Sequence, residues 1–291
     1  MQDRLTMQKK IHFLAGLPRS GSTLLANILA QNPRVHVTPT SGIVDMLVQV
    51  RNAWDRNDGF RAADRAASDA AKEDVLRAML QAYFARVERP VCIDKNRYWP
   101  EFLEMAAGIL GGTDRVKVIV SVRDLREVLA SFEEVYRRTS AFSEVLTDPA
   151  VALKFKTAQG RVEVFLDAAQ VVGRSYTGIR DALTRGWAPS LHFVDYEDLT
   201  RQPRATLAGI YRFLGEDAHE HDFNHIEQVT FEDDLVHGFK DLHRIREQVK
   251  PQQPKWNRVF DESVFQSPTW KQVESAATFW KTPRKPKAAT P

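Results

Sequence analysis

The segment IHFLAGLPRSGSTLLANILAQN, residues 11–32, constrains the fold of this chain more than any other stretch. Residues 11–17 form a short apolar run, which is typical of a buried parallel strand. After a glycine-containing turn, residues 22–32 carry apolar side chains at helical spacing, with Ser22 or Thr23 as the expected N-cap. A strand, a tight turn and a helix in this order predict an α/β fold with an anion site at the helix N-terminus.

Strands and helices continue to alternate along the rest of the chain. The β-branched run at 116–122 is the clearest strand and is expected at the centre of the sheet. We expect two further strands, at 90–94 and 190–196, and helices over 41–54, 72–88, 99–110, 124–138, most of 149–186 and 203–215. The alternation predicts a central parallel sheet flanked by helices, with right-handed crossovers and helical insertions. A single domain over residues 1–281 and a disordered tail over 282–291, rich in proline and lysine, are expected.

Composition narrows the class of protein. The chain has 291 residues and a formal net charge of only +3, which is too mild to indicate a nucleic-acid-binding protein. Cys92 is its one cysteine, so neither a disulfide framework nor a cysteine zinc site is expected. The histidines of 219–225 are interpreted as structural and not as metal ligands. No signal peptide and no apolar run of about 18 residues is present, so we expect a cytoplasmic protein that does not enter a membrane. A homodimer is the oligomer considered, although no sequence feature decides it.

The loop of residues 16–25 nearly matches the nucleotide-binding P-loop, G-x-x-x-x-G-K-S/T. Gly16 and Gly21 have the required spacing and Thr23 provides the last hydroxyl, but Ser22 stands where the lysine belongs. The central strand is followed by Arg123, a cation where a magnesium ligand would be expected. Both departures disfavour binding of a nucleoside triphosphate. The alternative hypothesis for the function is a degenerate P-loop phosphotransferase that uses Mg-ATP.

A second motif supports an anion site of a different kind. Arg123 closes the central strand and Ser131 lies two turns into the next helix, so both can reach one phosphate. With these residues the chain resembles the sulfotransferases that use 3′-phosphoadenosine 5′-phosphosulfate (PAPS). The family's phosphosulfate loop, P-R-S-G-S/T-T-L, corresponds to residues 18–24, and its 3′-phosphate element to Arg123 and Ser131. The resemblance spans residues 11 to about 260.

The resemblance implies a P-loop-like sulfotransferase architecture, PAPS as co-substrate, adenosine 3′,5′-bisphosphate (PAP) as product, and no metal. It assigns the phosphosulfate cradle to Arg19, Ser20, Gly21, Ser22 and Thr23. It further implies that Tyr196 lies beside the adenine and that Lys95 contacts the bridging oxygen of the leaving phosphate. A late basic loop that folds over the nucleotide would contribute Arg244, Arg246 and Lys250.

The catalytic base is not assigned by the motifs. Residues 25–54 are most similar to the tyrosylprotein sulfotransferases, in which a glutamate base stands where this chain has Thr40. The arginines that those enzymes carry near Gly42 and Met46 are also missing. The candidate bases are His36, Asp45 and Asp94. The expected acceptor is a hydroxyl of a small molecule, a carbohydrate or a peptide tyrosine. The remaining alternative to a sulfotransferase is a non-catalytic nucleotide-binding protein.

Overall fold

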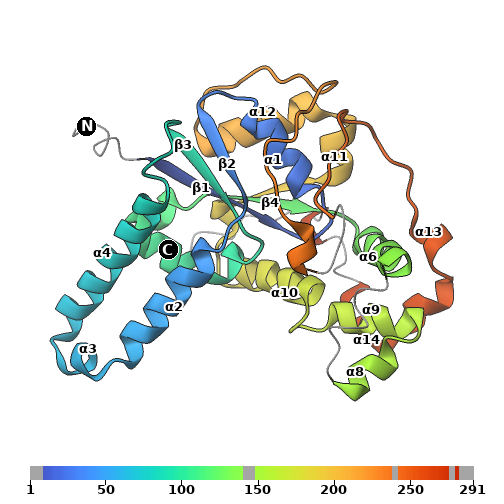
Figure 1. Ribbon diagram of the computed structural model, residues 1–291, viewed down its shortest axis with the longest axis horizontal. Helices are drawn as coiled ribbons and strands as arrows, with labels where there is room; N and C mark the ends of the chain where they lie inside the picture. The colour runs from blue at the N-terminus through green and yellow to red at the C-terminus, as the bar shows by residue number, and fades with distance from the viewer. Residues whose placement is uncertain (1–8, 140–147, 238–241, 275–278, 282–291) are drawn as a thin grey trace, which may run out of the picture.

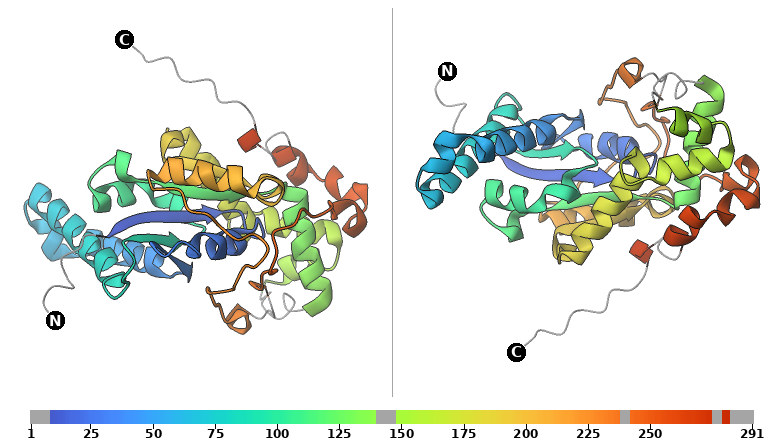
Figure 2. Two further views of the ribbon diagram at one scale, coloured as in Figure 1. Left: turned by 90° about the horizontal axis from the view of Figure 1, so that it is seen from above. Right: turned by 90° about the horizontal axis from the view of Figure 1, so that it is seen from below.

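A five-stranded parallel sheet forms the centre of the protein, with helices on both faces (Figures 1 and 2). The computed structural model describes residues 9–139, 148–237, 242–274 and 279–281. The strands, in the spatial order β2-β3-β1-β4-β5, are β1 (Lys10–Gly16), β2 (Val35–Thr40), β3 (Val91–Lys95), β4 (Val118–Val122) and β5 (Leu191–Asp195). The predicted parallel sheet flanked by helices is confirmed, and the tail at 282–291 lies outside the described residues.

The helices connect the strands and form a projecting arm. In chain order they are α1 (Ser22–Ala30), α2 (Ile43–Arg56), α3 (Asp58–Ala62), α4 (Arg65–Tyr83), α5 (Leu103–Leu110), α6 (Leu125–Thr139), α8 (Pro149–Lys154), α9 (Ala158–Leu166), α10 (Val171–Thr184), α11 (Tyr196–Arg201), α12 (Pro203–Leu214), α13 (Trp256–Val259) and α14 (Pro268–Glu274). Helices α2, α3 and α4 extend away from the sheet (Figure 1). Of the helices in the described part of the chain, none combines the length and the apolarity that a membrane crossing requires.

Strand β2 is a strand that the sequence analysis missed. Its residues, VHVTPT, mix polar side chains with a proline, so they lack the continuous apolar pattern of a central strand. The strand lies at the edge of the sheet, where it pairs with β3 from Val35 onward, and its register shifts between Val37 and Thr40. Pro39 is tolerated there because an edge strand does not need every backbone N–H for pairing.

Two hydrophobic cores, one on each face, explain why the central strands are apolar throughout. Phe13 points into the core that α5, α6 and α10 cover, where its ring lies 3.9 Å from that of Trp99. Leu14, the next residue, points into the opposite core with side chains of α1 and α12. Successive strand residues alternate between the faces, so a sheet covered on both sides must bury both sets. These cores leave the carboxyl ends of the strands free to form a site.

Candidate functional site

The loop after β1 is held in a conformation that exposes backbone amides at the start of α1. Gly16 has φ 139°, and a Cβ there would lie 2.0 Å from the carbonyl oxygen of Ser121. Gly21 is the N-cap residue of α1, with φ 87° and no side-chain capping hydrogen bond. The expected capping role of Ser22 or Thr23 is therefore wrong. The uncapped first turn leaves N–H groups available to bind an anion.

Ser20 fixes this loop rather than facing the cavity. Its side chain is buried, and its hydroxyl lies 2.5 Å from the carbonyl oxygen of Leu17 and 2.6 Å from the hydroxyl of Ser121 on β4. The side chain of Ser20 is thus turned away from the position that the resemblance implied. Its structural role is to tie the loop to the neighbouring strand.

A cavity of about 1160 Å³ opens at the carboxyl ends of the strands. Ligand sites commonly measure roughly 300–1000 Å³, so this cavity has room for a nucleotide and an acceptor together. Among the sequence-predicted site residues, those that line it are Arg19, Gly21, Ser22, Thr23, Asp45, Lys95, Arg123, Ser131, Tyr196, Arg244, Arg246 and Lys250. The structure therefore gathers residues from widely separated segments around one space.

Arg123 and Ser131 lie together on one side of the cavity, as their spacing predicts. Ser131 accepts a hydrogen bond of 3.0 Å from Nε of Arg19, whose Nη1 donates to the carbonyl oxygen of Leu242. The guanidinium of Arg123 lies 4.3 Å from the ring centre of Tyr196. Arg123 is only 7% exposed, yet its Nε has no hydrogen-bond partner within the described chain. A buried donor without an acceptor marks a place for an anionic ligand.

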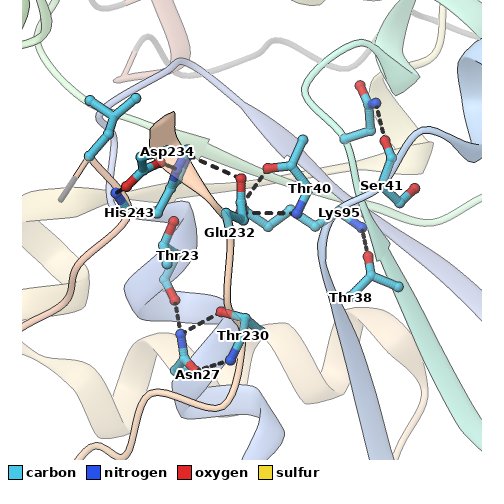
Figure 3. A network of polar contacts seen from close by, with 12 residues as sticks. Thr23, Asn27, Thr38, Thr40, Ser41, Lys95, Thr230, Glu232, Asp234 and His243 are labelled. Carbon is cyan, nitrogen blue, oxygen red and sulfur yellow. Dashed lines mark hydrogen bonds and ion pairs between the residues drawn. The ribbon is translucent and has the colours of Figure 1, made fainter. Parts of the chain in front are cut away.

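Lys95 forms the centre of a second polar group at the end of β3 (Figure 3). Its Nζ lies 2.7 Å from Oε1 of Glu232 and 2.8 Å from Oγ1 of Thr40. The same carboxylate oxygen accepts a 3.0 Å hydrogen bond from the backbone N–H of Thr40. Burial raises the pKa of Glu232, but Lys95 and the Thr40 amide outweigh this effect and lower the pKa to about 2. Glu232 is therefore ionised and holds Lys95 in place.

His243 extends the group around Lys95 and Glu232. Its Nδ1 lies 2.5 Å from Oδ1 of Asp234, and its Nε2 lies 3.4 Å from Oε2 of Glu232 (Figure 3). Burial is the main reason that the pKa of His243 is lowered from 6.5, although Asp234 and Glu232 oppose it. The imidazole is therefore neutral at pH 7, with Nδ1–H donating to Asp234 and the Nε2 lone pair free to accept a proton.

The sequence analysis did not find Glu232, Asp234 or His243. Glu232 and His243 lie in irregular segments between α12 and α13, and Asp234 begins the short 3-10 helix Asp234–His237, so no long helical or strand periodicity indicates which side chains turn inward. A signal was present in the acidic run at 232–234 and in the histidine that precedes Arg244. Neither feature specifies a partner without the tertiary structure.

The three candidate bases from the sequence differ in position. His36 lies on β2, where its ring contacts the edge of Phe84, and it is not among the described residues that line the cavity. Asp94 is buried on β3 and accepts a 2.8 Å hydrogen bond from Nε1 of Trp99. Of the three, only the exposed Asp45 on α2 borders the cavity. Neither His36 nor Asp94 is therefore among the described residues placed to reach a ligand in the cavity.

The histidines of 219–225 lie in a segment without helix or strand. His221 is buried with its Nε2 3.0 Å from the hydroxyl of Tyr211. No group of three or more His, Cys, Asp or Glu residues within the described ranges is arranged to hold a metal ion.

Comparison with known proteins identifies the family of this chain. Residues 12–220 match the sulfotransferase family, so the chain belongs to this family. A similar solved structure is the sulfotransferase domain of the Synechococcus PCC 7002 olefin synthase, with a TM-score of 0.55 and 21% identity over 96% of this chain and 98% of that one. A search of curated proteins gives no significant match.

Two further solved structures are similar to this chain at lower scores. The sulfotransferase domain from the curacin biosynthetic pathway has a TM-score of 0.48 and 18% identity over 98% of this chain and 95% of that one. Retinol dehydratase, in complex with androsterone and the inactive cofactor PAP, has a TM-score of 0.48 and 16% identity over 98% of this chain and 86% of that one.

Proposed function

We propose that this sulfotransferase moves the sulfuryl group of PAPS to a hydroxyl of an acceptor. The observation that carries the proposal is the pairing of two anion sites in one cavity. One is the loop of residues 18–24, which has an uncapped helix N-terminus but no P-loop lysine, and the other is the buried, unsatisfied Arg123 beside Ser131. A nucleotide with phosphates at both its 5′ and its 3′ end matches two separate cradles.

The residues around the cavity fit such a donor. The backbone amides of residues 20–23 and the side chain of Arg19 would hold the 5′-phosphosulfate, and Arg123 with Ser131 would hold the 3′-phosphate. Tyr196 would pack against the adenine. The exposed cations that border the cavity on the late loop, Arg244, Arg246 and Lys250, add positive charge where the donor carries negative charge.

The cluster around Lys95 supplies the chemistry of transfer. The acceptor oxygen attacks sulfur in line, a new S–O bond forms, and the bond from sulfur to the phosphate oxygen of PAP breaks. His243 Nε2 takes the acceptor proton, and the resulting imidazolium lies between the carboxylates of Asp234 and Glu232. Lys95 moves from Glu232 to the leaving phosphate oxygen and stabilises its developing charge.

Calorimetric titration with PAP, with and without Mg²⁺ and with ATP as comparison, tests the donor assignment. We expect metal-independent binding of PAP that ATP does not match. Arg123→Ala and Ser131→Ala should weaken PAP binding, by about 10- to 100-fold for the arginine, because a charge-assisted hydrogen bond to the 3′-phosphate is lost. Preference for Mg-ATP would instead support a degenerate P-loop phosphotransferase.

Transfer of ³⁵S from labelled PAPS to a panel of phenols, alcohols, sugars and tyrosine peptides tests the activity itself. A labelled product with any member establishes sulfuryl transfer and identifies the acceptor class. Tight PAP binding without transfer to the panel would favour the non-catalytic nucleotide-binding alternative.

A further inference from the structure

Glu127 is a buried carboxylate that joins two parts of the cavity wall. It lies one turn after Arg123 and one turn before Ser131 on the same side of α6, and it is 3% exposed. Its Oε2 accepts a 3.1 Å hydrogen bond from Nη2 of Arg123. Its Oε1 accepts hydrogen bonds from the backbone N–H groups of Lys255, at 2.7 Å, and Trp256, at 3.0 Å.

The backbone contacts of Glu127 fix the end of a segment that closes over the cavity. Residues 242–255, here called the closing segment, contribute Arg244, Arg246 and Lys250 to the cavity lining and end at the amides that Glu127 holds. The adjacent Trp256 ring packs 4.6 Å from the guanidinium of Arg126 on α6. The far end of the closing segment is therefore attached to the helix that also carries Ser131.

Arg123 has one nitrogen bound and another free. Nη2 is occupied by Glu127, whereas Nε has no hydrogen-bond partner among the described residues and lies 3.8 Å from Oε1 of Glu197. One fixed nitrogen restricts the rotation of the guanidinium, so the free nitrogen keeps its direction. The orientation of Arg123 thus depends on Glu127.

We propose that Glu127 is a positioning residue for 3′-phosphate selectivity: the amides of Lys255 and Trp256 hold its carboxylate in place, and the carboxylate orients Arg123, so that the enzyme distinguishes PAP from nucleotides without a 3′-phosphate. The inference rests on the proposed use of PAPS. It assigns a role to a residue that carries the same charge as the ligand and does not touch it.

The direction in which PAP affinity changes when Glu127 is substituted separates this positioning role from simple charge repulsion. Removal of a negative charge close to the 3′-phosphate would strengthen PAP binding if Coulomb energy dominated. Glutamine at this position has one acceptor oxygen and one NH₂ donor, so it cannot accept from Arg123 and from the two backbone amides together. If positioning dominates, Glu127→Gln weakens PAP binding.

The experiment compares PAP with adenosine 5′-monophosphate (AMP), which lacks the 3′-phosphate, by calorimetric titration of the full chain. Glu127→Gln should weaken PAP binding by about 10- to 100-fold, the range for loss of a charge-assisted hydrogen bond, and leave AMP binding within experimental error. In the double variant with Arg123→Ala, Glu127→Gln should add little, because Glu127 acts through Arg123.

Glu133→Gln is the matched control. Glu133 is a buried carboxylate on the same helix, it pairs with Arg161 and Arg137, and it does not belong to the described cavity lining. We expect this variant to keep the wild-type ratio of PAP to AMP affinity, even if it lowers the melting temperature. If Glu127→Gln does not fold, Glu127→Asp keeps the charge but shortens the side chain, and the same selective loss is expected.

Several results would overturn the inference. These are tighter or unchanged PAP binding in the folded Glu127 variant, an equal loss of PAP and AMP binding, or the same selective loss in Glu133→Gln. A wild-type enzyme that binds PAP no better than AMP would refute the proposed donor together with the inference. A wild-type enzyme that prefers PAP, with a variant that retains this preference, would refute the inference alone.

Discussion

The ion pair between Lys95 and Glu232 gives the sharpest stability prediction. The two side chains are 6% and 10% exposed, and their charged atoms are 2.7 Å apart. The pKa of Glu232 falls from 4.5 to about 2 in the folded protein. At about 1.4 kcal/mol for each unit of pKa, ionised Glu232 contributes roughly 3 kcal/mol to the free energy of unfolding at pH 7.

Glu232→Gln should therefore lower the free energy of unfolding at pH 7 by about 3 kcal/mol, because it leaves the Lys95 ammonium buried without its counter-charge. Urea denaturation followed by tryptophan fluorescence measures this change. Adding Lys95→Met should recover part of the loss, because the double variant no longer buries an unpaired charge. Glu262→Asp, at an exposed position, is the surface control, and its free energy of unfolding should stay close to that of the wild type.

The pH dependence of the free energy of unfolding follows from the same lowering of the Glu232 pKa. Since the folded pKa of Glu232 lies below the unfolded value, its contribution is fully present above pH 4.5 and is lost as the pH falls toward 2. The difference in stability between wild type and Glu232→Gln should therefore shrink over this range. A difference below about 0.5 kcal/mol at pH 7, typical of surface substitutions, or additive effects of the two substitutions would refute the argument for a coupled buried pair.

Three more results are expected. His243→Gln should reduce the transfer rate by roughly 100- to 10,000-fold at unchanged PAP affinity if His243 is the general base, whereas His36→Gln outside the cavity should not. Because the pKa of His243 lies below 6.5, the wild-type rate should fall on the acid side, as protonation removes the Nε2 lone pair; a rate that rises as the pH falls below 6.5 would contradict this. Gly21→Ala should weaken PAP binding, measured by calorimetry, because its Cβ would lie 2.6 Å from the Tyr196 ring.

Local sequence patterns indicated two segments that the structure places at the cavity, for a physical reason. The loop of residues 18–24 and the pair Arg123 and Ser131 each belong to one strand-to-helix connection. Within such a connection the backbone geometry fixes the relative positions of the side chains, so spacing alone indicates which residues can meet. The apolar runs of β1 and β4 likewise reveal their burial on both faces.

The group around Lys95 and Glu232 depends on contacts that no local pattern encodes. Lys95 and Glu232 are separated by 137 positions, and Glu232 lies in a segment without regular secondary structure. The edge strand β2 was also missed, and with it the position of Thr40 beside Lys95. The backbone N–H of Thr40 binds the carboxylate of Glu232, so an acidic group from a distant segment lies beside Thr40.

The sheet explains how such distant residues converge on one reaction. The described site takes a contribution from the carboxyl end of every strand: the anion loop from β1, Thr40 from β2, Lys95 from β3, Arg123 from β4 and Tyr196 from β5. Parallel strands place all these ends on one edge, whatever their separation in sequence. Described residues between α12 and α13 then place Glu232 beside Thr40 and Lys95, with His243 next to Glu232 (Figure 3). The residues proposed to bind the sulfuryl donor are thus fixed by the rigid sheet. The residues proposed to handle the acceptor proton lie outside the sheet, on a connection between helices. Such a connection can differ between enzymes while the donor site stays the same.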